Sequence, residues 1–267
     1  MDDLYAILKN PNNPIVLGKK KDFKSYGIDI QFEDQALHDL AVKAYEEKTG
    51  ARGLVSAVEK VLLKFEKRLP STEIRKFVVT REVVRNPERE LKRLLEDPSS
   101  PDMLKTFEQL LQRDIKGVED SIRNRRGEFE RRYGISLWEG RIRLIGHRVV
   151  EKGYDVNTVF EEVTDVKRQI EELEREFDRK HHIVLTFDEE AIDQMTLVAF
   201  EEDEKGASVC ARLSKDLEHG LKLIRDKTGK TEFTISKEAI KDPEGFLNVL
   251  IRDVYSMKSD PSTEVSL

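Results

Sequence analysis

The stretch EEKTGARGLVSAVEKVLL, from Glu46 to Leu63, places an arginine at the start of a helix that has one apolar face. Gly50 ends the preceding helix, and the apolar positions after it recur at helical spacing, which predicts one buried face. These positions are Leu54, Val55, Val58, Val61, Leu62 and Phe65. Arg52 is therefore predicted in the first turn, where the positive end of the helix dipole disfavours a cation. An anion supplied from outside the helix would explain the arginine.

Composition indicates a charge-rich globular chain. Its 267 residues are 38% hydrophobic and 37% charged, which is typical of about one to three domains with modest cores. No stretch approaches the roughly 20 apolar residues of a membrane span, and the first residues lack the order of a signal peptide, so we expect a cytoplasmic protein. The single cysteine, Cys210, excludes an internal disulfide, and we expect it to be buried in packing. The net charge of −6 argues against a general nucleic-acid-binding protein.

Two parts of the chain resemble each other at a nearly constant offset. The sequence IQFEDQALHDLAVKAYEE, from Ile30, resembles LTFDEEAIDQMTLVAFEE, from Leu185, so that Phe32 corresponds to Phe187. The match continues with one offset through four further pairs: Gly50 and Gly206, Phe77 and Phe233, Pro87 and Pro243, Leu91 and Leu247. So long a match with few gaps predicts a duplicated module. Each copy is expected to run strand, helix, helix, strand, helix.

The fold class that follows is α+β and predominantly helical, with two related small modules separated by long heptad-patterned helices. Apolar residues follow near-heptad spacing over 103–133 and again over 158–181. We expect these two helices to pack on each other as a hairpin, with intermolecular coiled-coil pairing as the alternative. The predicted domains are a first module at 1–97, a helical spacer at 98–182, a second module at 183–257 and a flexible tail at 258–267.

Three stretches of the amino-terminal third occur in an uncommon order: DLYAILKNPNNPI, then GIDIQFEDQALHDLAVKAYEEKTGARGLVSAVEKVLLKFEKRLPS, then FVVTREVV. Together they resemble the small C-terminal subdomain of ClpX-type unfoldases, which belong to the Clp family of AAA+ ATPases. The resemblance covers about residues 3–84. It implies that Arg52 is the sensor-2 arginine, which reaches the phosphates of ATP or ADP. Gly50 and Ala51 form the positive helix start beside it, which suits the same anion.

The resemblance also implies that an ATP-binding large domain is missing from this sequence. A Walker A loop is absent, since the nearest match, Gly229-Lys230-Thr231, has Ile224 where the first glycine should stand, and we interpret it as a turn. We therefore expect no ATPase activity and no tightly bound ATP, ADP or Mg in this chain alone. Met1 is interpreted as an introduced start, with the ATPase core upstream of it in the parent protein.

The partners implied by the resemblance belong to the parent protein. They are the upstream AAA+ large domain, neighbouring subunits of a hexamer, and a protein substrate or adaptor. A protease partner stays open, because the tripeptide Ile145-Gly146-His147 departs from a Leu/Ile-Gly-Phe protease-docking loop at its third residue. The extension beyond residue 84 would serve substrate, adaptor or subunit interaction. The alternative function is a stand-alone helical interaction module that has lost ATPase function.

Several other residues have plainer interpretations. Ser208 stands where the first copy has Arg52, so we expect the second copy to be structural or partner-binding. His181 and His182 lack a third ligand at metal spacing, which favours a solvated helix end over a metal site. Between Arg113 and Lys152 basic residues outnumber acidic ones, which favours a solvated face or a surface for an acidic partner over a nucleic-acid interface.

Overall fold

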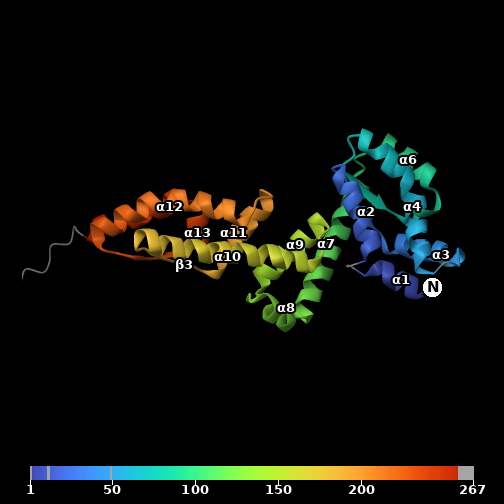
Figure 1. Cartoon of the computed structure of the whole chain (residues 1–267). Helices are drawn as coiled ribbons and strands as arrows, with labels where there is room; N and C mark the ends of the chain where they lie inside the picture. The colour runs from blue at the N-terminus through green and yellow to red at the C-terminus, as the bar shows by residue number, and fades with distance from the viewer. Residues whose placement is uncertain (1, 11–12, 49, 258–267) are drawn as a thin grey trace, which may run out of the picture. The chain divides into compact units, whose positions relative to one another are not determined.

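The computed structural model describes residues 2–10, 13–48 and 50–257. The predicted tail at 258–267 and the start at Met1 lie outside the described residues. The chain forms two compact units (Figure 1): unit 1 is Met1–Arg126 with Ile145–Val156, and unit 2 is Gly127–Leu144 with Asn157–Leu267. The segment predicted as a spacer, 98–182, therefore contributes helices to both units. Helices predominate throughout, with four short strands in the described part of the chain.

Module 1, at the amino-terminal end of unit 1, alternates strands and helices after two leading helices. Its elements are α1 (Asp2–Lys9), α2 (Pro14–Ser25), β1 (Asp29–Phe32), α3 (Asp34–Glu46), α4 (Ala51–Arg68), η1 (Leu69–Ser71), β2 (Lys76–Val79), α5 (Arg81–Arg85) and α6 (Pro87–Glu96). The two strands pair in parallel, with Ile30 opposite Phe77 and Phe32 opposite Val79. Parallel strands need a long crossover, and α3 and α4 supply it.

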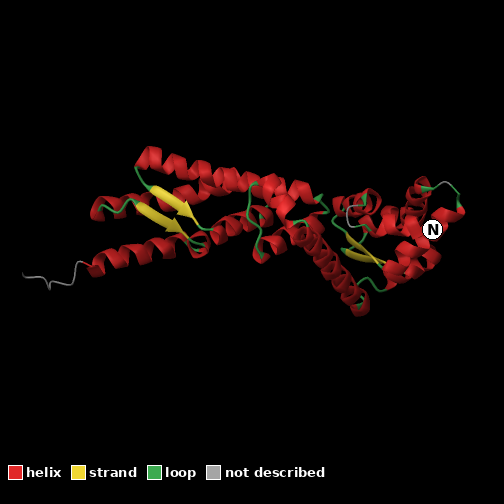
Figure 2. Ribbon diagram, turned by 90° about the horizontal axis from the view of Figure 1, so that it is seen from below, coloured by secondary structure: helices red, strands yellow, loops and turns green. Residues whose placement is uncertain are grey.

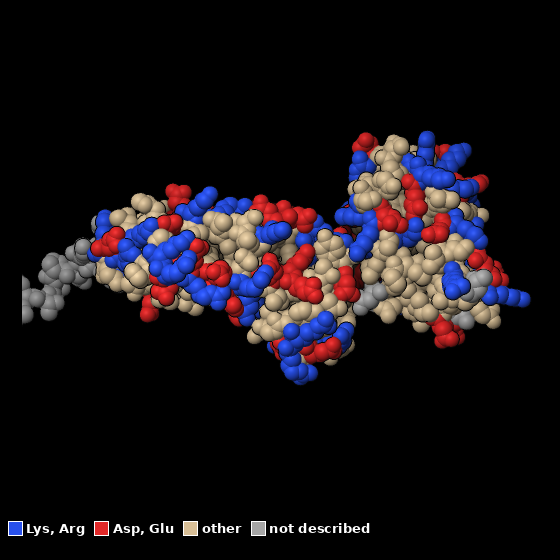
Figure 3. Space-filling model, in the orientation of Figure 1, with Lys and Arg blue, Asp and Glu red and all other residues tan. Residues whose placement is uncertain are grey.

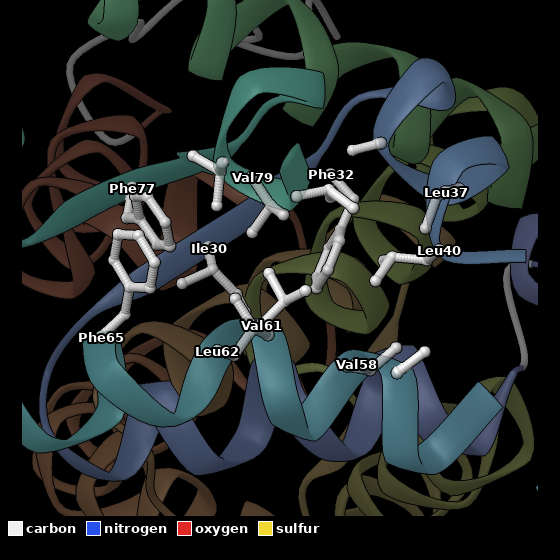
Figure 4. Packing of buried hydrophobic residues seen from close by; sticks show 14 of the residues in the cluster. Ile30, Phe32, Leu37, Leu40, Val58, Val61, Leu62, Phe65, Phe77 and Val79 are labelled. Carbon is white, nitrogen blue, oxygen red and sulfur yellow. The ribbon is translucent and has the colours of Figure 1, made fainter. Parts of the chain in front are cut away.

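The core of module 1 lies between this two-stranded sheet and the helices. Figure 4 shows the side chains of the strands pointing toward α4, and the rings of Phe65 and Phe77 stack with centroids 4.7 Å apart. Five of the six predicted apolar positions of α4 are buried, but Val55 is 42% exposed. Val55 lies one residue, or about 100°, around the helix from Leu54, so it faces away from the core, and Ala57 is buried instead.

Helix α7 (Pro101–Asn124) covers the other face of the same sheet. Phe107 of α7 is buried, and the ammonium group of Lys76 lies 5.1 Å from the centre of its ring. Gln31 and Val78, whose side chains alternate away from the core of module 1, are each only 3% exposed. The sheet of module 1 is therefore covered on both faces.

Unit 2 holds module 2, which runs from β3 to α14, and the helices that precede it. The elements are α8 (Arg126–Tyr133), α9 (Glu139–Lys152, shared with unit 1), α10 (Val156–His181), β3 (Val184–Phe187), α11 (Glu189–Glu201), α12 (Gly206–Thr228), β4 (Glu232–Ile235), α13 (Lys237–Lys241) and α14 (Pro243–Met257). The strands β3 and β4 are parallel, with Leu185 opposite Phe233. Apart from the short η1, which has no counterpart in module 2, the order of elements from β3 to α14 is the order from β1 to α6, and Phe32 and Phe187 are both buried.

Three features differ from the predicted elements. Each module has an additional five-residue helix, α5 or α13, after its second strand; in module 1 the hydroxyl of Thr80 caps it by accepting a hydrogen bond from the amide of Val83. The helix predicted over 103–133 is interrupted at Arg125, whose backbone (φ −110°, ψ 17°) leaves the helical region. Helix α7 packs on the sheet of unit 1, and α10 packs into the core of module 2 from Val166 onward, so the predicted hairpin is formed only in part, where Phe160 of α10 stacks on Phe129 of α8 with ring centroids 4.4 Å apart.

Candidate functional site

The start of α4 carries the predicted phosphate-facing residues. Gly50 precedes the helix with φ 63° and ψ −141°, a conformation that residues with a side chain rarely adopt. Among the described residues, which omit Thr49, no side chain caps this helix start by a hydrogen bond, and the first turn contains no acidic residue. The first-turn amides, which carry a partial positive charge, therefore donate to no described side chain.

Arg52 lies in the first turn of α4, as predicted, and both Arg52 and Ala51 are exposed. Within the described part of the chain, Arg52 forms no hydrogen bond and no ion pair. The next two residues, Gly53 and Leu54, are buried. The helix is thus anchored directly behind a guanidinium group that remains available to an anion from outside the chain.

A carboxylate on α3 holds the neighbouring helices around this site. Asp39 accepts hydrogen bonds from Nε of Arg85 at 2.7 Å and from Nε of Arg81 at 3.2 Å, which joins α3 to α5. Partial burial tends to raise the pKa of Asp39, but the hydrogen bonds from Arg85 and Arg81 outweigh that effect and hold its pKa below the usual range. Because α3 packs along α4, this contact helps to fix the helix that presents Arg52.

A chain of ion pairs fastens α7 to the same module. Lys9 contacts Asp34 at 3.1 Å, and Asp34 contacts Arg113 at 2.9 Å. Arg113 also contacts its neighbour Asp114 at 3.1 Å, and Asp114 contacts Lys20 at 2.8 Å. These contacts connect α1, α3, α7 and α2. They join residues up to 94 positions apart in the sequence, so no local pattern could have predicted them.

The corresponding helix start in module 2 has a different environment. Ser208 lies exposed in the first turn of α12, where Arg52 lies in α4. Gly206 is buried at the start of α12, and a Cβ atom on it would lie 3.0 Å from Cα of Val166 on α10. Figure 1 shows α10 and α12 running side by side. The start of α12 is therefore partly covered by another helix of the same unit.

Two of the remaining predictions are confirmed. Cys210 is buried, and burial raises the pKa of its thiol to about 12, so the reactive thiolate form is suppressed. Gly229 ends α12 in the left-handed conformation, with φ 78°, and its amide donates to the carbonyl of Arg225 at 2.7 Å. The segment Gly229-Lys230-Thr231 is therefore a helix-terminating turn.

The predicted solvated helix end is wrong for His181, whereas His182 is exposed as predicted. Its side chain is only 14% exposed and packs edge-on against Phe177, with ring centroids 5.3 Å apart. Burial is the main reason that its pKa is lowered, although Nε2 lies 3.5 Å from a carboxylate oxygen of Glu218. Among the described residues, no three His, Cys, Asp or Glu side chains are grouped closely enough to hold a metal ion.

On the face drawn in Figure 3, basic and acidic side chains are interspersed over both units. The tripeptide Ile145-Gly146-His147 lies inside α9 and not in a loop. No helix in the described ranges combines the length and the apolar composition that crossing a lipid bilayer requires.

Known proteins match the part of the chain that contains this site. A family model described as the C-terminal, D2-small domain of ClpB protein matches residues 15–71. This region is a Clp-family AAA+ C-terminal small domain. The Clp small domain is also similar to proteins named "ATP-dependent Clp protease ATP-binding subunit ClpX". The one from Treponema denticola is 35% identical over 86 residues, which is 32% of this chain and 21% of the relative.

Two further ClpX-named relatives give similar values. The protein from Borrelia duttonii is 40% identical over 85 residues, covering 32% of this chain and 20% of the relative. The protein from Bacteroides thetaiotaomicron is 39% identical over 77 residues, covering 29% and 19%. This chain therefore spans about a fifth of the length of the curated relatives that it matches.

Proposed function

We propose that this chain is the C-terminal portion of a subunit of an ATP-dependent Clp-type protein unfoldase, and that Arg52 is its sensor-2 arginine. The observation that carries the proposal is the exposed Arg52 at the uncapped start of α4, inside a Clp small domain. A guanidinium group beside unsatisfied helix amides suits a phosphate. In the parent protein, an upstream large domain would bind ATP or ADP with Mg in the cytoplasm, and Arg52 would contact the phosphates.

The small domain would act as a relay between nucleotide and extension. Arg52 gains or loses an anionic partner as the state of the phosphates changes, which alters the preferred angle of α4 relative to the large domain. The ion pairs of Asp34 and Asp114 with Arg113 and Lys20 hold α7 on module 1, so α7 would follow that movement. Beyond α7, the extension would contact a substrate, an adaptor or a neighbouring subunit of a hexamer, and a protease partner stays open.

We also propose that modules 1 and 2 arose by duplication and that module 2 has lost phosphate sensing. The same order of elements, the parallel pairing of both strand pairs and the burial of Phe32 and Phe187 support this. Ser208 in place of Arg52 supports the loss. Superposition of an experimental structure of 28–97 on one of 183–253 tests it; backbones that do not align over both strands and both long helices would contradict a common origin.

The sensor-2 assignment is tested with Arg52→Ala in the full-length parent and with Ser208→Ala as the matched control. We expect Arg52→Ala to lower ATP hydrolysis, or the unfolding achieved per ATP, by about tenfold or more, because a charge-assisted contact is lost. Circular dichroism should stay unchanged, since Arg52 has no packing role. Unaltered turnover and unfolding would leave the stand-alone interaction module as the better account.

A further inference from the structure

A crevice of about 580 Å³ lies in unit 1, where β2, α5, α6 and the start of α7 meet. This volume falls within the usual range for small-molecule sites. Its apolar lining includes Phe77, Val83, Leu94 and Met103. The helices α6 and α7 follow the segment matched by the Clp family model, so the crevice is a property of the extension together with module 1.

Glu90 lines this crevice from α6 and is only 9% exposed. Its Oε1 atom is buried and has no hydrogen-bond partner. The nearest cations, Arg89 and Arg93, are each 3.7 Å from a carboxylate oxygen, and both side chains are 74% exposed. A buried carboxylate oxygen without a hydrogen bond is costly, so a chain that keeps one needs a reason for it.

Module 2 indicates that packing alone does not require a carboxylate at this position. The offset that aligns Pro87 with Pro243 aligns Glu90 with Phe246. Phe246 packs against the core of module 2. An aromatic side chain is therefore compatible with this site in the same arrangement of helices, and Glu90 replaces apolar packing with a negative charge.

The charges around Glu90 favour a cationic ligand. The lining contains five carboxylates, those of Glu33, Glu82, Glu90, Asp97 and Asp102, and three guanidinium groups. The guanidinium groups of Arg81 and Arg85 already pair with Asp39. Because Asp39 is not part of the lining, these two arginines do not neutralise the carboxylates of the crevice. Among the described residues, Glu82, Asp97 and Asp102 form no ion pair with a basic side chain. The lining therefore carries more acidic than basic side chains next to its apolar residues.

We propose that this crevice binds a guanidinium or ammonium group carried on an aliphatic stem. The cation pairs with Glu90 and satisfies its carboxylate, while the stem lies against Phe77 and Met103. Either a free amine or an arginine or lysine side chain of a peptide has this chemistry. The proposal does not depend on Arg52, because the crevice and the start of α4 share no lining residue.

Methionine-methyl NMR of the full chain tests the proposal with an internal control. The chain has four methionines; Met103 lines the crevice, and Met195 is buried in module 2. Agmatine serves as the free probe, N-acetyl-arginine amide as the peptide-like probe, and N-acetyl-citrulline amide as the uncharged control of similar shape. We expect both cationic probes to shift the Met103 methyl signal saturably and to leave Met195 unchanged.

The variant Glu90→Gln keeps the shape of the side chain and removes its charge. We expect it to weaken the binding of agmatine by about tenfold or more, and Glu90→Phe, which copies module 2, to abolish it. Because Met195 reports only on unit 2, an unchanged circular dichroism spectrum and a cooperative urea transition show that unit 1 is folded in either variant. Tighter binding of the arginine amide than of agmatine identifies a peptide side chain as the ligand, and the reverse identifies a free amine. The proposal is overturned if Met103 does not respond, if the citrulline control binds equally, or if Glu90→Gln binds as the wild type does.

Discussion

The two modules of this chain share their order of elements but differ at the start of their second long helix. Among the described residues neither start has a side-chain cap, but in module 1 the start presents an exposed arginine, Arg52. In module 2 it packs against α10 through Gly206, and Ser208 takes the place of the arginine. Both helices nevertheless keep buried apolar residues behind the first turn. Packing constrains the apolar positions in both modules, whereas only module 1 keeps a group suited to an anion.

The outer faces of the two sheets also differ between the modules. In module 1 the outer face is covered by α7, and Gln31 and Val78 are buried. In module 2 the corresponding residues, Thr186 and Thr234, are exposed. Figure 2 shows the strands that carry these residues, β3 and β4, side by side with no helix drawn across them. Threonine in place of valine suits a face in contact with water, so the sequence of module 2 is adapted to an open sheet.

The strongest test of the comparison is the truncation of equivalent core residues. We expect Phe32→Ala and Phe187→Ala each to lower the free energy of unfolding by on the order of 3 to 5 kcal/mol, because both rings are buried. Circular dichroism during urea unfolding follows the whole chain, and fluorescence of the single tryptophan, Trp138, follows unit 2. A cost below about 1 kcal/mol for either variant would mean that the two positions do not carry equivalent packing.

A second test concerns a buried ion pair that has no counterpart in module 1. Arg141 is 1% exposed, and its Nε lies 2.5 Å from a carboxylate oxygen of Asp193, while Nη1 lies 2.8 Å from Glu189. We expect Asp193→Asn to cost about 3 kcal/mol, because it leaves a buried guanidinium with less compensation. His38→Asn, at the equivalent position of module 1, should change stability by less than about 0.5 kcal/mol because its side chain is 44% exposed. Equal costs in urea unfolding would contradict this distinction.

A third test asks why each module has a glycine at the start of its second long helix. Gly50 adopts a positive φ with open space around its Cα, whereas Gly206 lies close to Val166. We expect Gly50→Ala to cost about 1–3 kcal/mol through backbone strain, and Gly206→Ala a similar amount through crowding. Adding Val166→Ala removes Cγ2, which would lie 3.2 Å from the new Cβ, but leaves Cα at 3.0 Å, so it should relieve part of the cost of Gly206→Ala and cannot affect Gly50→Ala. The measurement is urea unfolding of both single variants, of Val166→Ala alone and of the double variant Gly206→Ala/Val166→Ala; a double variant no more stable than the sum of its singles would exclude crowding by the Val166 side chain.

Local sequence patterns predicted the features that depend on local physics. Helical spacing of apolar residues placed α4 and its buried face, and the glycine before it placed Arg52 in the first turn. Features that depend on distant partners were missed. Covering of the sheet by α7, the pairing of Arg113 with Asp34 and the burial of Glu90 each join segments that no periodicity connects. The exposure of His181 was predicted wrongly for the same reason, since its environment includes Glu218 on another helix.

The smallest expected effect concerns acid sensitivity, because module 1 uses a titratable group where module 2 does not. Asp39, paired with Arg81 and Arg85, corresponds to Gln194, which is buried and carries no charge. The pKa of Asp39 is lowered in the folded state. Its stabilising contribution is therefore present above the ordinary aspartate pKa of about 3.9 and is lost as the pH falls through the lowered folded value. Both arginine side chains are more than 40% exposed, so we expect the ion pairs of Asp39 to contribute no more than about 1 kcal/mol to the free energy of unfolding.

Urea unfolding at neutral and acidic pH should show that Asp39→Asn is destabilised at neutral pH and approaches the wild type in acid. Gln194→Asn, which changes no charge, should shift stability equally at both pH values. A deficit of Asp39→Asn that persists in acid would assign the role of Asp39 to packing, and the two modules would then not differ in their use of charge at this position.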